Sequence, residues 1–129
     1  MSMRLQLALN VRDLDEAIAY YSKLFGAEPA KIKEGYANFA IGNPPLKLVL
    51  FEHPEADERL NHLGVETFEQ QDVDDAVTRF QEAGLVEKIQ EDTTCCFARQ
   101  SKVWSADPQG MRWEWYRIME DAEDYGVDG

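Results

Sequence analysis

Apolar and polar residues alternate in two segments that lie in equivalent places of the two halves of the chain. Within residues 5–11 every second position is Leu or Val, and residues 62–67 repeat the alternation. A period of two is typical of a β-strand with one buried face. Each segment therefore predicts a strand, with Gln6 and His62 at equivalent positions on the side opposite the aliphatic residues.

Each predicted strand is followed by an apolar stripe with helical spacing. The first stripe follows Asp13, with Glu16 three residues later, which is typical of a capping box, and Gly26 is placed to end the helix. The second stripe predicts a cap at Asp72 and an end at Gly84. The stripes consist of Leu14, Ala17, Ile18, Tyr21, Leu24 and Phe25 in the first helix and of Val73, Ala76, Val77, Phe80 and Ala83 in the second.

Three short strand-like runs follow each helix. They comprise residues 30–33, 36–41 and 46–51 in the first half and residues 87–91, 97–106 and 112–117 in the second. The pattern predicts an α+β fold of two βαβββ modules, residues 1–55 and 56–117, within one domain of residues 1–117. Neither module is long enough to bury much surface alone, so we expect the two to enclose a shared cavity.

Composition and charge restrict the possible partners. The chain of 129 residues is 44% hydrophobic and 29% charged, as expected for a globular domain. Its formal net charge of −12 would repel a phosphate backbone, which argues against nucleic acid. Much of this charge lies in residues 118–129, an acidic C-terminal tail without a basic residue, which we expect to be solvated and mobile.

The sequence also indicates a compartment. No stretch is apolar enough to span a bilayer, and residues 1–10 lack the features of a secretory signal. Two adjacent cysteines make no disulfide framework. These features predict a cytoplasmic protein without a membrane partner. Both a monomer and a homodimer are compatible with the sequence.

Polar residues on the predicted strands suggest a metal site. Gln6 lies among leucines, where an unpaired amide would cost about 1–3 kcal/mol. Glu114 lies between two tryptophans, and a buried carboxylate needs a counter-charge or a metal. His62 can be a ligand or an ordinary structural residue. A salt bridge with Arg112 or Arg117 is the alternative for Glu114.

Taken together, Gln6, His62 and Glu114 provide three protein ligands and leave coordination positions open. Structural metal sites tend to be closed, whereas catalytic sites leave room for water or substrate. The set resembles the facial triad of non-haem iron oxygenases, with glutamine in place of one histidine. The neutral oxygen favours Fe(II), Mn(II) or Ni(II) over ions that prefer thiolates.

The only two cysteines, Cys95 and Cys96, are adjacent. Neighbouring thiols can both reach one soft ion, so the pair indicates capture of a thiophilic metal or metalloid. The alternative is that both are small buried residues without a chemical role.

The repeated module, with candidate ligands on the first strand of each half and on the last strand of the second, resembles the vicinal oxygen chelate superfamily. This superfamily includes glyoxalase I, extradiol dioxygenases and bleomycin resistance proteins. More narrowly, the chain resembles the bacterial carbon–arsenic lyases, also known as cadmium-induced proteins. The resemblance covers residues 3 to about 117 and is carried by Leu5–Val11, Gly35–Ile41, Pro44–Leu50, Leu60–Glu66 and Thr93–Phe97.

The resemblance implies an Fe(II)-dependent dioxygenase that uses O2 to split the carbon–arsenic bond of trivalent organoarsenicals such as methylarsenite, releasing arsenite. It places the metal on Gln6, His62 and Glu114 and the arsenic on Cys95 and Cys96. Ni(II), Zn(II) or Mn(II) can take the place of Fe(II) during purification.

Three other functions remain open at this point. A glyoxalase-type isomerase or thiol transferase would use the same metal as a Lewis acid but would not need adjacent thiols. A sequestration protein would bind arsenite or cadmium through the thiols without a reaction. A bleomycin-type binding module would need no metal triad.

Overall fold

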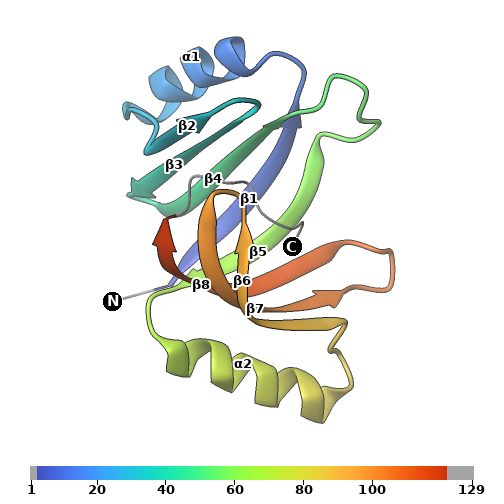
Figure 1. Cartoon of the computed structure of the whole chain (residues 1–129). Coiled ribbons are helices and arrows are strands. Elements are labelled where there is room, and N and C mark those ends of the chain that lie inside the picture. Colours follow the sequence, from blue (N-terminus) through green and yellow to red (C-terminus); the bar gives the residue numbers. More distant parts are fainter. Residues whose placement is uncertain (1–2, 122–129) are drawn as a thin grey trace. The chain divides into compact units, whose positions relative to one another are not determined.

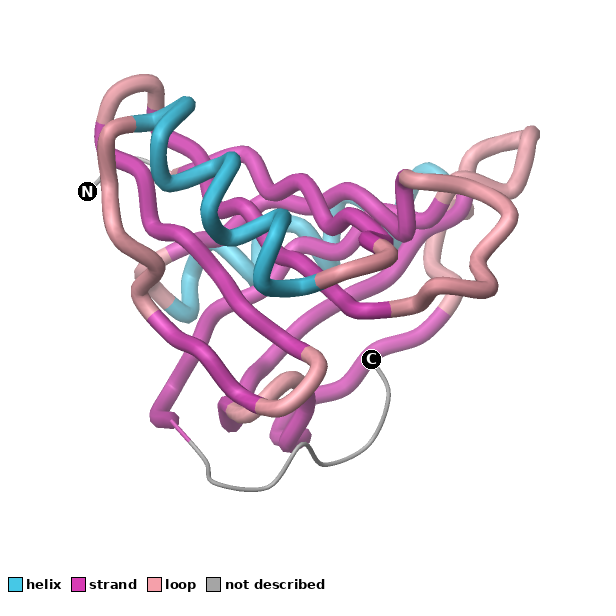
Figure 2. The backbone as a smooth tube through the Cα atoms, turned by 90° about the horizontal axis from the view of Figure 1, so that it is seen from above, coloured by secondary structure: helices cyan, strands magenta, loops and turns pink. Residues whose placement is uncertain are grey.

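The computed structural model of the chain describes residues 3–121. Its order of one strand, one helix and three strands occurs twice (Figure 1), which confirms the predicted α+β fold of two βαβββ modules. Figure 2 distinguishes the helices, strands and loops of the backbone by colour. The elements are β1 (Arg4–Val11), α1 (Leu14–Phe25), β2 (Lys31–Lys33), β3 (Tyr36–Gly42), β4 (Pro45–Glu52), β5 (Leu60–Thr67), α2 (Gln70–Ala83), β6 (Lys88–Cys95), β7 (Ala98–Ala106) and β8 (Arg112–Asp121).

The chain divides into two compact units, an N-terminal unit of Arg4–Leu63 and a C-terminal unit that begins at Gly64. The strand order is β2-β3-β4-β1 in the N-terminal unit and β8-β7-β6 in the C-terminal unit. Strand β5 crosses the boundary, with residues 60–63 in the N-terminal unit and residues 64–67 in the C-terminal unit. The sequence bounds of the modules, 1–55 and 56–117, and their shared cavity stay predictions.

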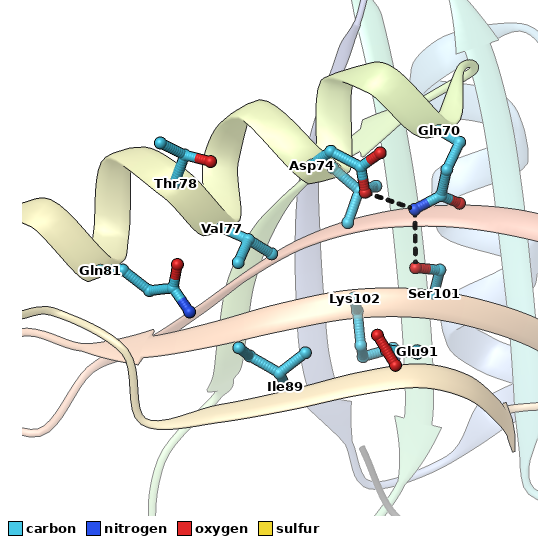
Figure 3. A pocket seen from close by; sticks show the side chains of 10 residues that line it. Gln70, Asp74, Val77, Thr78, Gln81, Ile89, Glu91, Ser101 and Lys102 are labelled. Carbon is cyan, nitrogen blue, oxygen red and sulfur yellow. Dashed lines mark hydrogen bonds between the residues drawn. The ribbon is translucent and has the colours of Figure 1, made fainter.

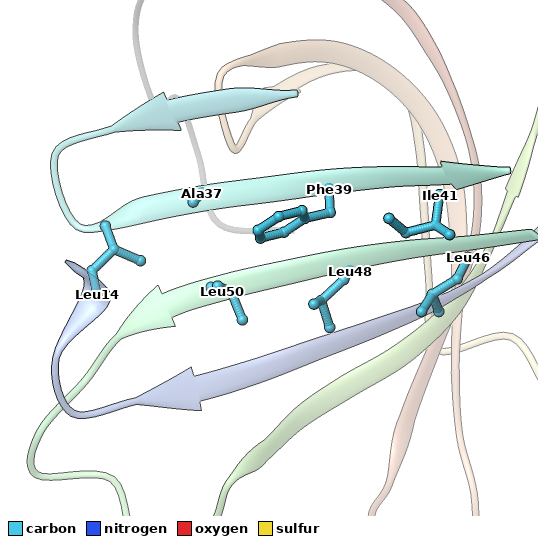
Figure 4. Close-up of a cluster of buried hydrophobic side chains, with 7 residues drawn as sticks. All are labelled: Leu14, Ala37, Phe39, Ile41, Leu46, Leu48 and Leu50. Atoms are coloured by element: carbon cyan, nitrogen blue, oxygen red, sulfur yellow. The ribbon is translucent and has the colours of Figure 1, made fainter. Parts of the chain in front are cut away.

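In the N-terminal unit, one face of the sheet packs against α1. Strands β1 and β4 are parallel, and β3 and β4 are antiparallel, so paired residues point to the same face. Leu14 of α1 and side chains of β3 and β4 form an apolar cluster (Figure 4), which consists of Leu14, Ala37, Phe39, Ile41, Leu46, Leu48 and Leu50. Leu7 and Leu9 of β1 pack against this cluster, which leaves Gln6 on the other face.

Helix α1 begins and ends as predicted. The side chain of Asp13 accepts a hydrogen bond from the backbone N–H of Glu16 over 3.0 Å, and Gly26 ends the helix with φ of 63°. A left-handed conformation of this kind favours glycine because it has no Cβ.

The predicted cap of the second helix is wrong. Helix α2 begins at Gln70, with Glu69 in the N-cap position, so Asp72 lies within the first turn. The amides of Gln70 and Gln71 donate to carboxylates four residues later, over 3.1 Å to Asp74 and 2.7 Å to Asp75. Such pairs stabilise a helix, and they extend α2 toward its N-terminus. Gly84 ends the helix, as predicted.

In the C-terminal unit, α2 packs on one face of antiparallel strands β6, β7 and β8. Its buried residues Ala76 and Phe80 contact Val103 of β7, and Trp115 of β8 packs against them. The rings of Phe80 and Trp115 pack edge to face, with 5.8 Å between their centroids. Helix α2 therefore does not cover the opposite face of this sheet.

Two strands of this unit are longer than predicted. Strand β6 continues past residue 91 to Cys95, through a register shift between Gln90 and Thr93 that breaks the alternation in the sequence. Strand β8 continues past residue 117, because Glu120 pairs with Arg99 of β7. The rest of the predicted tail, residues 122–129, lies outside the described residues. Neither helix within residues 3–121 has the length and apolar character needed to cross a bilayer.

Candidate metal and thiol site

Gln6 and His62 lie against each other on the face of the N-terminal unit that α1 does not cover. The side-chain nitrogen Nε2 of Gln6 lies 3.3 Å from Nε2 of His62, and only 3% and 7% of the two residues are exposed. The repeat placed these two residues at equivalent positions of two strands, and the structure brings them together.

A chain of amide hydrogen bonds fixes the tautomer of His62. Nδ2 of Asn10 donates to the carbonyl oxygen of Glu58, and Nδ2 of Asn61 donates to Oδ1 of Asn10, both over 3.0 Å. Oδ1 of Asn61 therefore faces Nδ1 of His62, 2.8 Å away, and can only accept. Nδ1 of His62 is therefore the donor in this contact, and a ring with its single proton on Nδ1 can use Nε2 to accept from Gln6 or to bind a metal.

An aromatic pair borders His62 on the same unit. The ring of Phe51 lies 6.4 Å from the ring of His62 and 5.6 Å from that of Tyr36, between centroids. The hydroxyl of Tyr36 accepts a hydrogen bond from Nδ2 of the buried Asn38 over 2.9 Å. The surroundings of His62 are therefore packed, which limits the positions that the ring can adopt.

Glu114 lies on the face of the C-terminal unit that α2 does not cover. Its Oε1 is 2.7 Å from Nζ of Lys102, and both side chains are buried. The sequence suggested Arg112 or Arg117 as the alternative partner of Glu114, and Lys102 of the neighbouring strand takes this place. The guanidinium of Arg112 lies over the ring of Trp104, 4.1 Å from its centroid.

The electrostatic environment of Lys102 keeps it charged. Burial alone lowers the pKa of Lys102, but the Glu114 carboxylate, followed by Cys95 and then Cys96, outweighs that effect, so the pKa lies above its ordinary value. Lys102 also lies over the rings of Trp104 and Tyr116, 5.4 Å and 5.6 Å from their centroids. The ammonium group thus has anionic or π-electron partners on several sides.

The two cysteines lie at the turn between β6 and β7. Cys95 ends β6 opposite Ala98, so Cys96 and Phe97 form a two-residue hairpin turn, with φ of 54° and 64°. Positive φ at both central positions is the pattern of a type I′ turn, which normally uses Asn-Gly. A bulky residue in this region is strained, and such strain is found where function requires one geometry.

The turn brings the two sulfur atoms together. Sγ of Cys95 lies 3.1 Å from Sγ of Cys96, well beyond the roughly 2.05 Å of a disulfide, and both are free thiols. Cys95 is buried and Cys96 is partly exposed. The amide of Gln100 donates to the carbonyl oxygen of Cys95 over 2.7 Å and holds the end of β6 in place. The arrangement suits one thiophilic atom bound by two sulfurs.

A separate cavity of about 400 Å³ lies on the helix side of the C-terminal unit (Figure 3). In it, the amide of Gln70 bonds to Asp74 and, over 3.2 Å, to Ser101 of β7. None of the five predicted site residues lines this cavity.

The sequence reasoning missed Lys102 and Asn61. The alternation of Ala98, Gln100, Lys102 and Trp104 along β7 carried a signal for Lys102, because a lysine on a buried face needs an anionic partner. No comparable signal identifies Asn61, whose role depends on an amide from β1.

Comparisons of the chain with known proteins found one matching family model and several similar curated proteins. Residues 5–115 match the family model of the Glyoxalase/Bleomycin resistance protein/Dioxygenase superfamily. The chain is 57% identical over 123 residues to the cadmium-induced protein CadI of Mycobacterium tuberculosis, which covers 95% of this chain and 81% of that protein. It is 52% identical over 121 residues to the trivalent organoarsenical cleaving enzyme of Thermomonospora curvata, with 93% and 80% covered.

A solved structure with the same fold is the Mn(II)-bound glyoxalase from Novosphingobium aromaticivorans. It has a TM-score of 0.65 and 19% identity, over 95% of this chain and 42% of that chain. A crystal structure of catechol 2,3-dioxygenase has a TM-score of 0.60 and 20% identity, over 96% and 42%. At this identity the likeness concerns the fold alone.

Proposed function

Because this chain belongs to the glyoxalase/bleomycin resistance protein/dioxygenase superfamily, we propose that it is an Fe(II)-dependent carbon–arsenic lyase that cleaves trivalent organoarsenicals such as methylarsenite to arsenite. The observation that carries the proposal is the pair of thiols 3.1 Å apart in a strained turn. The relative named as a trivalent organoarsenical cleaving enzyme, 52% identical, supports the same substrate class.

In this proposal Cys95 and Cys96 bind the substrate. Trivalent arsenic exchanges its oxygen ligands for thiolates, so two sulfurs can hold the arsenic while its organic group stays free. The substrate would then be held at two points, which orients the carbon–arsenic bond and lowers the entropic cost of reaching the reactive geometry.

The residues present fit a divalent metal. Rotation of the Gln6 amide would turn its oxygen toward Nε2 of His62, because the two amide ends occupy the same space. With the Glu114 carboxylate, these groups make a set of two oxygens and one nitrogen, which suits Fe(II) or Mn(II). Fe(II) held there would supply the binding and activation of O2. Gln6, His62 and Glu114 therefore serve as ligands in our proposal, in agreement with the sequence.

A second candidate function is sequestration of a soft ion without a reaction. The thiol geometry and the 57% identity to a relative named as a cadmium-induced protein favour it. In that case the three proposed metal ligands would be dispensable, and binding would persist in metal-free protein. A glyoxalase-type reaction, in contrast, would not depend on the thiols.

The decisive experiment is aerobic incubation of Fe(II)-loaded protein with methylarsenite, followed by arsenic speciation. We expect arsenite to accumulate in the presence of oxygen and not under strict anaerobiosis, and pentavalent methylarsenate to stay unchanged. Undiminished arsenite release without oxygen would contradict the dioxygenase part of the proposal. Stoichiometric binding of methylarsenite with no product would identify the sequestration protein.

Asn61 provides an independent test of the metal site. Replacing Asn61 with Ala removes the acceptor for Nδ1–H of His62, so the ring no longer presents Nε2 in one orientation. Loss of the hydrogen bond that orients a metal-binding histidine typically lowers metal affinity about 10–100-fold, and we expect a decrease of this size for Asn61→Ala. The measurement is competition between the protein and a chelator for Co(II) or Fe(II).

The matched control is Asn61→Asp, which retains an oxygen acceptor beside Nδ1. Asp lacks the N–H that Asn61 donates to Asn10, so we expect its metal affinity to lie between that of the unchanged protein and that of Asn61→Ala. Equal metal affinity for Asn61→Ala and the unchanged protein would show that the tautomer of His62 does not matter for metal binding, or that His62 is not a ligand.

A further inference from the structure

The two sulfur atoms at the turn between β6 and β7 lie within reach of a covalent bond. Sγ of Cys95 is 3.1 Å from Sγ of Cys96, compared with about 2.05 Å in a disulfide. Because the two residues are neighbours in the chain, closing this gap requires a change in the torsion angles of the turn and no approach of distant elements. The chain has no other cysteine, so each thiol has the other as its only intramolecular partner.

The two thiols differ in their access to solvent. Cys96 is partly exposed, whereas Cys95 is buried, with 2% of the residue exposed. Oxidants react with accessible thiols, and the product stays reversible where a second cysteine lies beside the first. Cys96 is therefore placed to meet an oxidant, and Cys95 is placed to convert the product into a disulfide.

A disulfide between neighbouring residues is strained. Adjacent Cα atoms lie about 3.8 Å apart across a trans peptide, less than the roughly 4.4–6.8 Å of most disulfides. The bond closes a small ring that contains the peptide between Cys95 and Cys96, so this peptide must twist. Such strain makes a disulfide easy to reduce, which is typical of regulatory bridges rather than of structural ones.

Gln100 of β7 holds the peptide that this ring would contain. Its amide donates to the carbonyl oxygen of Cys95 over 2.7 Å, and Gln100 is buried. That carbonyl belongs to the peptide bond between Cys95 and Cys96, so a twist of the peptide turns the oxygen away from Gln100. A buried carbonyl that loses its donor costs free energy. The hydrogen bond therefore favours the two free thiols over the disulfide.

We propose that Cys95 and Cys96 are a site of reversible oxidation, at which a hydroperoxide joins the two sulfur atoms in a disulfide and thereby prevents uptake of trivalent arsenic. Only the consequence for arsenic rests on the proposed function. Reduction by a free thiol, through thiol–disulfide exchange, restores both cysteines.

The oxidation proceeds in two steps. The sulfur of Cys96 attacks the peroxide, so an S–O bond forms, the O–O bond breaks, and the alcohol leaves with the proton of the thiol. The sulfur of Cys95 then attacks that of Cys96, so the S–S bond forms, the S–O bond breaks, and hydroxide leaves as water with the proton of Cys95. The peroxide gains the two electrons that the thiols lose.

The test treats the protein, purified without added iron, with tert-butyl hydroperoxide. We expect a monomer whose intact mass is lower by two hydrogen atoms and which neither reacts with iodoacetamide nor retains phenylarsine oxide. Reduction with dithiothreitol and desalting should restore both reactions, and phenylarsine oxide added first should protect the thiols. Disulfide-linked dimers, or a stable product that has gained oxygen, would overturn the proposal.

Single-cysteine variants test the order of the two steps. In Cys95→Ser, the accessible Cys96 should form a sulfenic acid that dimedone traps, because no second thiol is present to react with it. In Cys96→Ser, the buried Cys95 should react with the peroxide about tenfold more slowly. Equal rates for the two variants would contradict the assignment of Cys96 as the thiol that reacts first.

Gln100→Met tests whether the hydrogen bond favours the reduced form. Methionine keeps the length of the side chain and removes the donor. We expect the equilibrium constant for oxidation, measured by thiol labelling in glutathione buffers, to rise about 3–10-fold, because the reduced form loses one hydrogen bond. Circular dichroism verifies that the variant is folded.

The matched control for Gln100→Met is Ser101→Ala on the same strand. This change removes the hydroxyl that accepts from Gln70 and leaves the peptide between Cys95 and Cys96 as it is, so we expect no change in the equilibrium constant. An unchanged constant in Gln100→Met, or an equal rise in Ser101→Ala, would show that Gln100 does not hold the thiols in the reduced form.

These readouts involve no cleavage of a carbon–arsenic bond. A failure of the lyase proposal would therefore leave the loss of two hydrogen atoms and its reversal unaffected. A failure of the oxidation proposal would show in the intact mass while arsenite release persists in the loaded enzyme.

Discussion

Replacing either Cys95 or Cys96 with Ser is expected to abolish tight binding of trivalent arsenicals and, with it, cleavage. A single thiol loses the advantage of a second attachment point, which for two linked contacts amounts to about 10²–10⁴-fold in affinity. The 3.1 Å separation of the two sulfur atoms makes them suitable for holding one arsenic atom together. Binding is measured as arsenic retained after desalting, with methylarsenite and phenylarsine oxide as probes.

The neighbouring residue Thr94 provides the control for the cysteine variants. Thr94→Ser changes the same strand, β6, without removing a sulfur atom, so we expect arsenical binding and turnover close to those of the unchanged protein. Metal content should be the same in all these variants, because the proposed ligands lie on other strands. If either serine variant loses its iron, or if the double variant still cleaves methylarsenite at the original rate, arsenic capture is not the role of the thiols.

Replacing Glu114 is expected to have the second large effect. Glu114 is the only anionic group among the three proposed ligands. Loss of a residue that merely hydrogen-bonds to a metal ligand lowers metal affinity by up to roughly 100-fold, and we expect a larger decrease for Glu114→Ala. Turnover should then be undetectable. Metal content after dialysis and arsenite release under air are the two measurements.

Two further variants separate loss of the ligand from loss of the fold. Removing the carboxylate leaves Lys102 buried without its 2.7 Å partner, and breaking a buried ion pair costs about 3–5 kcal/mol of stability. Glu114→Gln keeps the volume, and Glu114→Gln combined with Lys102→Met also removes the unpaired charge. Gln6→Ala, which removes only a neutral oxygen, should weaken metal binding less. Full metal occupancy and activity in Glu114→Ala would show that Glu114 is not a ligand.

The sequence determined the order of elements because that order depends on local chemistry. The alternation along β1 and β5, the capping box of Asp13 and Glu16 and the left-handed Gly26 and Gly84 each act within a few residues. The prediction was wrong where two local patterns competed. At α2, the hydrogen bonds of the Gln70 and Gln71 side chains favour an earlier start of the helix than the predicted cap at Asp72.

The sequence also indicated the candidate site residues, because chemically unusual residues are conspicuous in an apolar pattern. Gln6 among leucines, Glu114 between tryptophans and two adjacent cysteines each required a partner that the neighbours in sequence do not provide. What these residues do together on two units stays a proposal, tested by the variants above.

Only the tertiary structure decided which partners these residues have, because hydrogen bonds and ion pairs form across strands that the sequence does not align. The register of β7 and β8 pairs Glu114 with Trp104 and Lys102 with Tyr116, so Lys102 and Glu114 are diagonal neighbours whose side chains form an ion pair. The amide of Asn10 likewise holds the amide of Asn61 that orients His62. The type I′ turn that brings Sγ of Cys95 to 3.1 Å from Sγ of Cys96 likewise depends on the pairing of β6 with β7. The local sequence thus determined which residues can take part in the candidate site. Strand pairing determined which partners they contact and at what distances.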